Sequence, residues 1–591
     1  MIHHVLERPS RLSTAAPAPT DARPARGRSA YALRPLLAAG LVSILAWAGV
    51  YILLFSHTLW HSPTLIPDHW PAVFYPIEAL FAWDWIHAHR ETSAGLVNVG
   101  LWLALAAVLL GAWGWALRVT GRLRTADPWI VREGFRIILV GLVLMSLILV
   151  FSPGFTSQDV FSYIWYGKMA GVYGVSPYTH TPNYFAWQDP QRWLQWVYWK
   201  NQTSVYGPAW VWPAAALARL AEALGGDIVT YLLTHRFLAA GLHIANTLLI
   251  WNLAGKLMPR SPGARLAATV FYGWCPLVVW EFANNAHNDA LMVFWILVAV
   301  WCHLKGMGQA RHEPRRGLRG WWQAAVVALT LAALVKLIAI VLIPGYMMLL
   351  FRTVDPAHPW RRRVAIGAQA GALALGLSAL LYWPHWEGLI TLQPLITAPG
   401  NERYVNSLGD VVRYRVPEII HWLGTTFNLP GEHTWRVVAI GDSMERWVRP
   451  LFTLTAGAII AVLSLRVHDF KSLLRNWGWS LVAYLLIGAL WFWPWYVTWF
   501  APLAALRGPG RLRTTAILYS TGGMVLYGLY PLLAPPFGDL EGYVPLICFG
   551  PVAFYLLRCT LSDLLSKLRT WRTGRVRLPA RAVPEPVTAD T

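Results

Sequence analysis

Long apolar runs separated by short polar segments repeat along the chain from about residue 35 to about residue 559. A helix needs roughly 20 apolar residues to cross about 30 Å of hydrocarbon, and it satisfies its backbone polar groups internally. Several runs have this length. The pattern therefore predicts an all-α, polytopic transmembrane helical protein with about 14 membrane segments.

The composition and the charge pattern support a membrane protein. The 591 residues are 56% hydrophobic and 13% charged, whereas soluble domains are about 25% charged. The net charge of +20 would favour nucleic acid as the partner of a soluble protein. Here Arg and Lys cluster between the apolar runs, which by the positive-inside rule marks cytoplasmic loops. We expect a multi-pass protein of the cell membrane with both termini in the cytoplasm, the lipid bilayer as a partner, and no nucleic acid.

The apolar and polar runs also divide the chain into consecutive regions. We expect a disordered cytoplasmic N-terminus (1–34), N-terminal transmembrane helices (35–152), an outer catalytic loop with interfacial helices (153–207), a transmembrane core (208–383), a second outer loop (384–448), C-terminal transmembrane helices (449–559) and a cytoplasmic tail (560–591). Residues 208–255 are ambiguous. They resemble two hydrophobic segments, but the charge pattern requires an odd number of crossings, so 208–224 is short or re-entrant, or a third crossing is hidden.

A carboxylate follows directly on the third apolar run. Asp159 lies eight residues beyond Phe151, and apolar or small residues recur at helical spacing up to about residue 172. This pattern predicts an interfacial helix with Asp159 at its N-terminal end and Gln158 or Ser157 as its cap. The polar and aromatic stretch from Trp187 to Lys200 predicts a second interfacial helix.

Other polar residues map to the same, extracytoplasmic face. His287, Asn288 and Asp289 lie between two apolar runs, Lys336 separates the short runs 321–335 and 337–351, and Arg403 lies in the second outer loop. Ionisable residues at membrane depth are costly and are usually functional or paired. Their convergence on one face indicates an active site outside the cytoplasm.

These residue types suit transfer of a sugar from a phosphate. A partly desolvated carboxylate is a good general base for a hydroxyl group, and cations stabilise a phosphate leaving group. Structural alternatives exist for each residue. Asp159 can serve as an N-cap or as the ion-pair partner of Lys168, His287 and Asp289 can close an interhelical turn, Lys336 can extend to the interface, and Arg403 can be a solvated charge.

An ordered set of motifs resembles a known family. It comprises Asp159 after an early span, then Tyr163 and Gly167, Gly174 with Pro177-Tyr178, Tyr206-Gly207-Pro208, His287-Asn288-Asp289, Lys336, and the segment Trp493 to Trp499. In this order the motifs resemble those of the polyprenyl-phosphate-sugar-dependent glycosyltransferases of the GT-C fold. Among these, the bacterial polyprenyl-phosphate-mannose-dependent mannosyltransferases are the most similar.

The resemblance implies a membrane hexosyltransferase. It would move a hexose, mannose by resemblance, from a polyprenyl-phosphate donor to a hydroxyl of a glycolipid or glycan acceptor, with inversion and with Asp159 as the general base. The remaining roles would be phosphate binding by Lys336 and Arg403, orientation of sugar or phosphate by His287, Asn288 and Asp289, and lining of the donor groove by Tyr163, Tyr206, Trp495 and Tyr496. Relatives often carry a second acid two residues after the base, where this chain has Phe161. We therefore expect no metal and no cofactor.

Other functions fit parts of the pattern. A polytopic transporter or flippase of a lipid-linked or sugar substrate would use Asp159 and Lys336 as substrate ligands, but it would place them near the middle of the membrane. Another GT-C enzyme, such as a protein O-mannosyltransferase or a lipid A aminosugar transferase, would share the base and the donor class. A nucleotide-sugar donor is not expected, because no Gly-rich phosphate loop lies between a strand and a helix.

Overall fold

A computed structural model of the chain describes residues 26–55, 65–74, 93–123, 127–188, 193–312, 320–354, 359–397, 404–427, 433–533 and 544–572. Every regular element within these ranges is a helix, and one isolated bridge joins Val405 to Trp491. The predicted all-α class is confirmed.

Eight helices of the described residues are long and apolar enough to cross a membrane. They are α1 (Arg26–Leu53), α4 (Ser93–Arg122), α5 (Pro128–Val150), α8 (Ile228–Leu257), α11 (Asp289–His312), α14 (Pro359–Tyr382), α17 (His433–Leu465) and α21 (Val544–Arg572). A bent pair, Pro262–Gly273 and Pro276–Asn284, would make a ninth span with a 49° bend. The polytopic membrane protein is confirmed, whereas the expected number of about 14 segments is not.

The remaining helices, which are shorter or less apolar, connect and cover these spans. They are α2 (Leu65–His69), α6 (Asp159–Gly171), α7 (Pro208–Ala223), α9 (Pro262–Gly273), α10 (Pro276–Val279), α12 (Trp321–Val335), α13 (Ile343–Arg352), α15 (Gln393–Ile396), α16 (Leu408–Thr426), α18 (Phe470–Ala483), α19 (Ala501–Arg507) and α20 (Arg511–Leu533). Helix α7 has 16 residues and α8 has 30. The ambiguous region 208–255 therefore consists of one short helix and one long one. This agrees with the explanation that the segment 208–224 is short.

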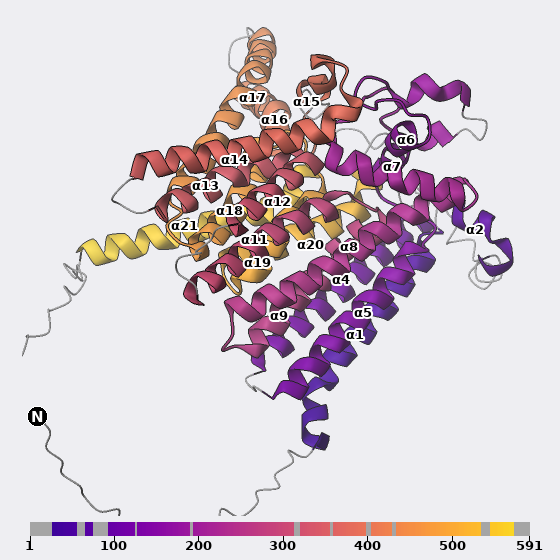
Figure 1. Ribbon diagram of the computed structural model, residues 1–591. Coiled ribbons are helices and arrows are strands. Elements are labelled where there is room, and N and C mark those ends of the chain that lie inside the picture. The colour runs from indigo at the N-terminus through magenta and orange to yellow at the C-terminus, as the bar shows by residue number, and fades with distance from the viewer. Residues whose placement is uncertain are drawn as a thin grey trace, which may run out of the picture.

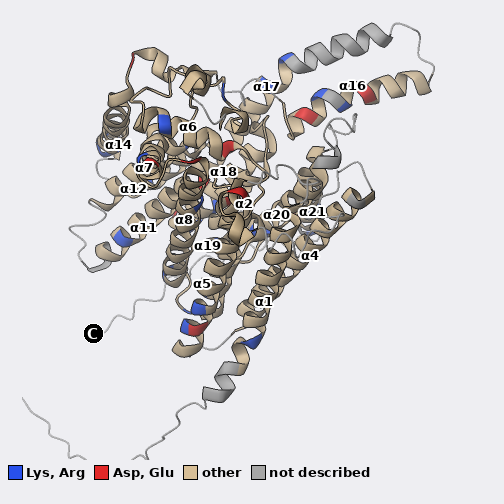
Figure 2. Ribbon diagram, turned by 90° about the vertical axis from the view of Figure 1, so that its right-hand side faces the viewer, with Lys and Arg blue, Asp and Glu red and all other residues tan. Residues whose placement is uncertain are grey.

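The N-terminal half forms a bundle of long helices. In Figure 1, α1, α4, α5, α8 and α9 run side by side, and Figure 2 shows few charged residues along their length. Trp274, directly after α9, illustrates the packing. A Cβ atom at Gly40 or Gly141 would lie 2.9 or 2.8 Å from its ring, and its indole nitrogen donates to the carbonyl of Ile138 at 2.8 Å. Glycine on α1 and α5 thus admits a large aromatic ring that joins three helices.

Three local predictions differ from the structure. Helix α1 begins at Arg26, so residues 26–34 are helical rather than disordered; Ala30, Ala32 and Leu33, which are good helix formers, continue the first span backwards. Around the expected second interfacial helix, the described residues form only the short 3₁₀ turns Pro182–Gln188 and Trp193–Trp196. Finally, α21 continues to Arg572, well into the predicted tail.

Candidate functional site

Helix α6 begins at Asp159, close to the predicted position, but it is enclosed by protein rather than lying on an interface. Each of its residues from Val160 to Gly167 is buried. The close approach of α7 explains this, since a Cβ atom at Gly167 would lie 2.4 Å from the carbonyl oxygen of Ala214. Gln158 occupies the N-cap position without a side-chain cap bond, while the backbone N–H of Asp159 donates to the hydroxyl of Ser157 at 3.3 Å.

Lys336 lies at a break between two helices, as the sequence predicted. Helix α12 ends at Val335, Lys336 has an extended backbone, and a 3₁₀ turn (Leu337–Leu342) follows. The break directs its ammonium group to Asp289 at the start of α11, with Nζ 2.8 Å from Oδ1 and 3.1 Å from Oδ2. The indole N–H of Trp499 also donates to Oδ1 of Asp289. Asp289 is fully buried, and Lys336 retains 17% side-chain exposure.

Asp159 and Lys336 line one cavity of about 700 Å³. Its wall combines polar groups such as Gln202 and Thr203 with aromatic rings, among them Tyr198, Trp199, Tyr206, Trp491, Trp493, Trp495 and Tyr496. Beyond Lys336 the wall becomes apolar, with Leu337, Ile338, Ile340, Val341 and Leu395. The cavity thus offers a charged, aromatic part and a hydrocarbon-like part to a ligand.

Burial makes Asp159 a stronger base than an ordinary aspartate. The pKa of its carboxyl is raised from 3.8 to about 6, mainly by desolvation; Lys336 and the hydrogen bond from Trp199 limit the rise, and Asp289 contributes to it. The indole N–H of Trp199 donates to Oδ1 of Asp159 at 3.2 Å. At neutral pH the carboxylate is therefore mostly ionised and yet able to take a proton.

Lys168 is not the ion-pair partner of Asp159. Its ammonium group lies 3.6 Å from Oε1 of Glu222 and 4.6 Å from the ring centroid of Trp193. One structural alternative for Asp159, an ion pair with Lys168, is thereby removed.

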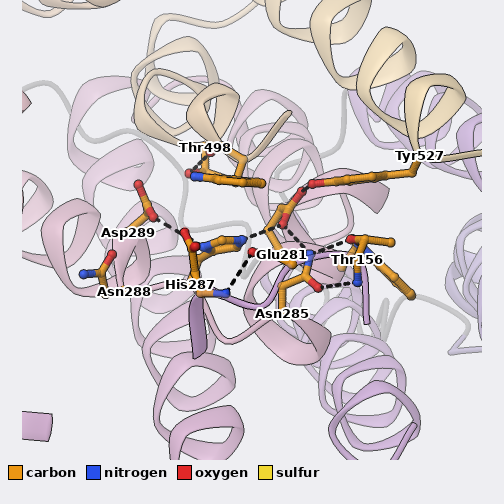
Figure 3. Close-up of polar contacts among 12 residues, drawn as sticks. Thr156, Glu281, Asn285, His287, Asn288, Asp289, Thr498 and Tyr527 are labelled. Carbon is orange, nitrogen blue, oxygen red and sulfur yellow. Dashed lines mark hydrogen bonds and ion pairs between the residues drawn. The ribbon is translucent and has the colours of Figure 1, made fainter. Parts of the chain in front are cut away.

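His287 and Asn288 lie behind the cavity wall instead of lining it. Figure 3 shows His287 between Glu281 and Asp289, with its Nε2 3.4 Å from the Glu281 carboxylate and its Nδ1 4.0 Å from that of Asp289. Its ring stacks on that of Trp495, with the two ring centroids 4.3 Å apart. Burial lowers the pKa of His287 to about 3, so the ring is neutral at pH 7. Its contacts with both carboxylates are therefore polar contacts of an uncharged imidazole.

Tyr163 also lies behind the cavity. Its hydroxyl is 3.4 Å from Nδ1 of His287 and from Oδ1 of Asn288, and its ring packs against Tyr206. Tyr166, two helical turns after Asp159, lines the cavity in its place. Tyr206, Trp495 and Tyr496 line it as expected.

Two cavity residues had no distinguishing signal in the sequence. Trp199 is one of four tryptophans in the stretch from Trp187 to Lys200, both ends included. Arg449 lies on α17, where we expected a span to begin at about residue 450. The predicted cation Arg403 lies outside the described residues. Among the residues that the structure does describe, Lys336 and Arg449 are the cations that line the cavity.

No group of three or more His, Cys, Asp or Glu side chains within the described ranges is arranged to hold a metal ion. The independence from metal that Phe161 suggests stays a prediction.

Comparison with known proteins identifies relatives. Residues 70–352 match the family model described as alpha-(1->6)-mannopyranosyltransferase, N-terminal domain. An alpha-(1->6)-mannopyranosyltransferase of Mycobacterium tuberculosis is 25% identical over 427 residues, which are 64% of this chain and 66% of the relative. Alpha-(1->6)-mannopyranosyltransferase A of Corynebacterium glutamicum is 25% identical over 217 residues, 36% of this chain and 41% of the relative.

The matched part is thus less than two thirds of either relative. The comparison with solved structures found no match. The family match covers Asp159 and Lys336, which line the cavity, and the segment before α11, which lies behind its wall. The chain is therefore similar to alpha-(1->6)-mannopyranosyltransferases, and its resemblance to bacterial mannosyltransferases is confirmed.

Proposed function

We propose that this protein is a membrane mannosyltransferase that moves mannose from a polyprenyl-phosphate donor to a hydroxyl of a glycolipid or glycan, on the extracytoplasmic side. The observation that carries the proposal is the shared cavity. A carboxylate with a raised pKa and a lysine line the same space, in a chain similar to mannosyltransferases. Base and phosphate ligand are the two groups that this reaction requires.

Asp159 would act as the general base. Trp199 donates to Oδ1, so Oδ2 would take the proton of the acceptor hydroxyl. The acceptor oxygen then forms a bond to the anomeric carbon from the face opposite the phosphate, and the bond from that carbon to the phosphate oxygen breaks with its electron pair. The products are an inverted glycoside, a polyprenyl phosphate and a protonated Asp159, which returns its proton to water.

Lys336 would hold the phosphate. Two contacts join its ammonium group to Asp289, and an ammonium group has three protons, so one remains for a phosphate oxygen. Arg449 on α17, which also lines the cavity, would supply the second cation. His287, Asn288 and Tyr163 would support this arrangement from behind the wall, whereas Tyr206, Trp495 and Tyr496 would contact the sugar or the lipid.

The apolar part of the cavity favours a lipid-linked donor. It follows Lys336 directly in the chain, and Leu337 and Ile340 are 45% and 50% exposed in the protein. A phosphate at Lys336 would therefore leave an isoprenoid chain lying along these side chains. A nucleotide-sugar offers no group for this surface.

The test compares two donors. Purified protein in lipid nanodiscs is incubated with radiolabelled polyprenyl-phosphate mannose or GDP-mannose and with a panel of synthetic mannosides that carry a hydrophobic aglycone. We expect labelled product from the lipid donor alone, with the opposite anomeric configuration to the donor. Product from GDP-mannose in the absence of lipid donor, or a retained configuration, would contradict the proposal.

A further inference from the structure

The loop that precedes Asp159 is held by side chains from distant parts of the chain. Residues 151–158 connect the end of α5 to the first turn of α6 and contain no regular helix. A loop of this kind gains a fixed conformation only if its backbone groups find partners. Several of its partners among the described residues come from α8 and from the segment just before α11.

Arg236 provides the first set of contacts. It is fully buried on α8, and its guanidinium donates to the carbonyls of Val150 at 3.0 Å, Ser152 at 2.7 Å and Gly154 at 3.3 Å. Among the described residues no carboxylate lies within ion-pairing distance of it. A charged group inside a span is costly, and these three backbone contacts offset part of that cost.

Two asparagines provide the second set. Asn284 donates to the Ser152 hydroxyl at 2.6 Å and to the Gly154 carbonyl at 2.7 Å. Asn285 accepts from the Thr156 backbone N–H at 3.0 Å and donates to the Thr156 hydroxyl at 2.9 Å, as Figure 3 shows for the labelled pair.

A strained residue separates these asparagines from the Lys336 partner. Ala286 has a φ of 56° and is fully buried, a conformation that L residues rarely adopt and that the surroundings must enforce. It follows a π-helical turn, Trp280–Asn284. The turn directs Asn284 and Asn285 to the loop before Asp159, while Asp289 reaches Lys336.

We propose that Arg236, Asn284 and Asn285 are positioning residues that hold the 152–156 backbone and so fix the Asp159 carboxylate at the cavity. The inference rests on the proposed role of Asp159 as the base. A helix C-cap alone would engage carbonyls of α5, but Ser152 and Gly154 lie beyond its last residue, Val150. The segment from Glu281 to Asp289 therefore positions both functional groups. Asn284 and Asn285 hold the loop before the base, and Asp289 binds Lys336, the proposed phosphate ligand.

Loosening this loop admits water to Asp159 and reduces the desolvation of its carboxyl. The charged and titratable groups that interact with Asp159 are Lys336, Asp289, Glu281, Tyr163, Tyr166, Tyr206 and Tyr496. Asn284→Ala changes none of them and no charge, and both hydrogen bonds that Asn284 donates go to the loop, so any change in the titration of Asp159 would arise through the loop. Asn285 is less suitable, because it also donates to the Glu281 carboxylate at 2.8 Å.

The test reads the titration of Asp159 directly. Carbodiimide couples an amine to a protonated carboxyl, and the tryptic segment 137–168 contains Asp159 as its single acidic residue. Mass spectrometry of this peptide as a function of pH gives the midpoint. We expect a midpoint near 6 in the wild type, and a shift of at least about one unit toward the ordinary value of roughly 4 in Arg236→Gln and Asn284→Ala. Transfer by both variants should fall about tenfold or more in kcat, with a smaller change in KM.

Matched controls are Arg513→Gln and Asn476→Ala. Both residues are buried, and they donate to the backbone carbonyls of Ala505 and Leu463 at 3.1 and 2.7 Å, away from the cavity. We expect no shift of the Asp159 midpoint in either control variant. Should Arg236→Gln fail to fold, the midpoint of Asn284→Ala tests the inference alone. An unchanged midpoint in Asn284→Ala overturns the inference, and absence of transfer by the wild type would overturn the proposed function without affecting the labelling result.

Discussion

Replacing Lys336 by Met tests how much Lys336 contributes to stability, through its ion pair with Asp289, and how much it contributes to mannosyl transfer. Met keeps much of the side-chain length and removes the charge. Asp289, which is fully buried, would then keep the indole N–H of Trp499 as a partner but lose its cation. Removing one member of a buried ion pair costs about 3–5 kcal/mol. The pair is partly exposed on the lysine side, so we expect a value near the lower end, roughly 3 kcal/mol.

A second substitution tests this assignment. In Lys336→Met/Asp289→Asn the buried charge is gone, and most of the lost stability should return, because the neutral amide needs no cation. Transfer should not return, because loss of a charge-stabilising group at a leaving oxygen costs about 10²–10³ in rate. The assays are the thermal unfolding midpoint in detergent and the rate of mannosyl transfer per folded protein. A double variant that regains transfer would refute the phosphate role and reduce Lys336 to a partner of Asp289.

Three further outcomes follow from the cavity. Because the base acts when deprotonated and burial raises the pKa of Asp159 to about 6, kcat/KM should fall about tenfold per pH unit below that value; an acidic limb near the ordinary aspartate pKa would contradict this. Gly207→Ala should lower the unfolding midpoint, since its Cβ would lie 2.2 Å from the Leu334 carbonyl oxygen and overpacking costs about 1–3 kcal/mol; an unchanged midpoint would count against that contact. Arg449→Gln should raise the KM for the lipid donor about tenfold, while the exposed Arg446→Gln, outside the cavity, should not; equal effects would argue against phosphate binding by Arg449.

The sequence predicted those parts of the site that stand out against an apolar background. Asp159, Lys336 and Asp289 are polar residues at the ends of hydrophobic runs, so the order of the spans was enough to assign them to one face. The structure brings Asp159 and Lys336 to one cavity and pairs Lys336 with Asp289. Which side of the membrane this face occupies stays a prediction.

Other parts depend on tertiary contacts that no local pattern contains. Helical spacing places both Tyr163 and Tyr166 within two turns of Asp159, and only the packing of α7 decides that Tyr166 reaches the cavity. Arg236 is one of several polar residues within a long span. Its partners, the carbonyls at the end of α5 and just beyond, lie more than 80 residues earlier in the chain, so its role required the folded structure.

The most direct test of the account is transfer of labelled mannose from polyprenyl-phosphate mannose, measured in EDTA at neutral pH for the wild type, Asp159→Asn and Asp227→Asn. Asp227 caps α8 through a hydrogen bond that asparagine can also accept, 2.9 Å from the Thr230 N–H, and it does not line the cavity. We predict full transfer by the wild type and by Asp227→Asn, and a loss of about 10² or more in Asp159→Asn at equal folded yield. Undiminished transfer by Asp159→Asn, or loss of wild-type transfer in EDTA, would contradict a metal-independent base at Asp159.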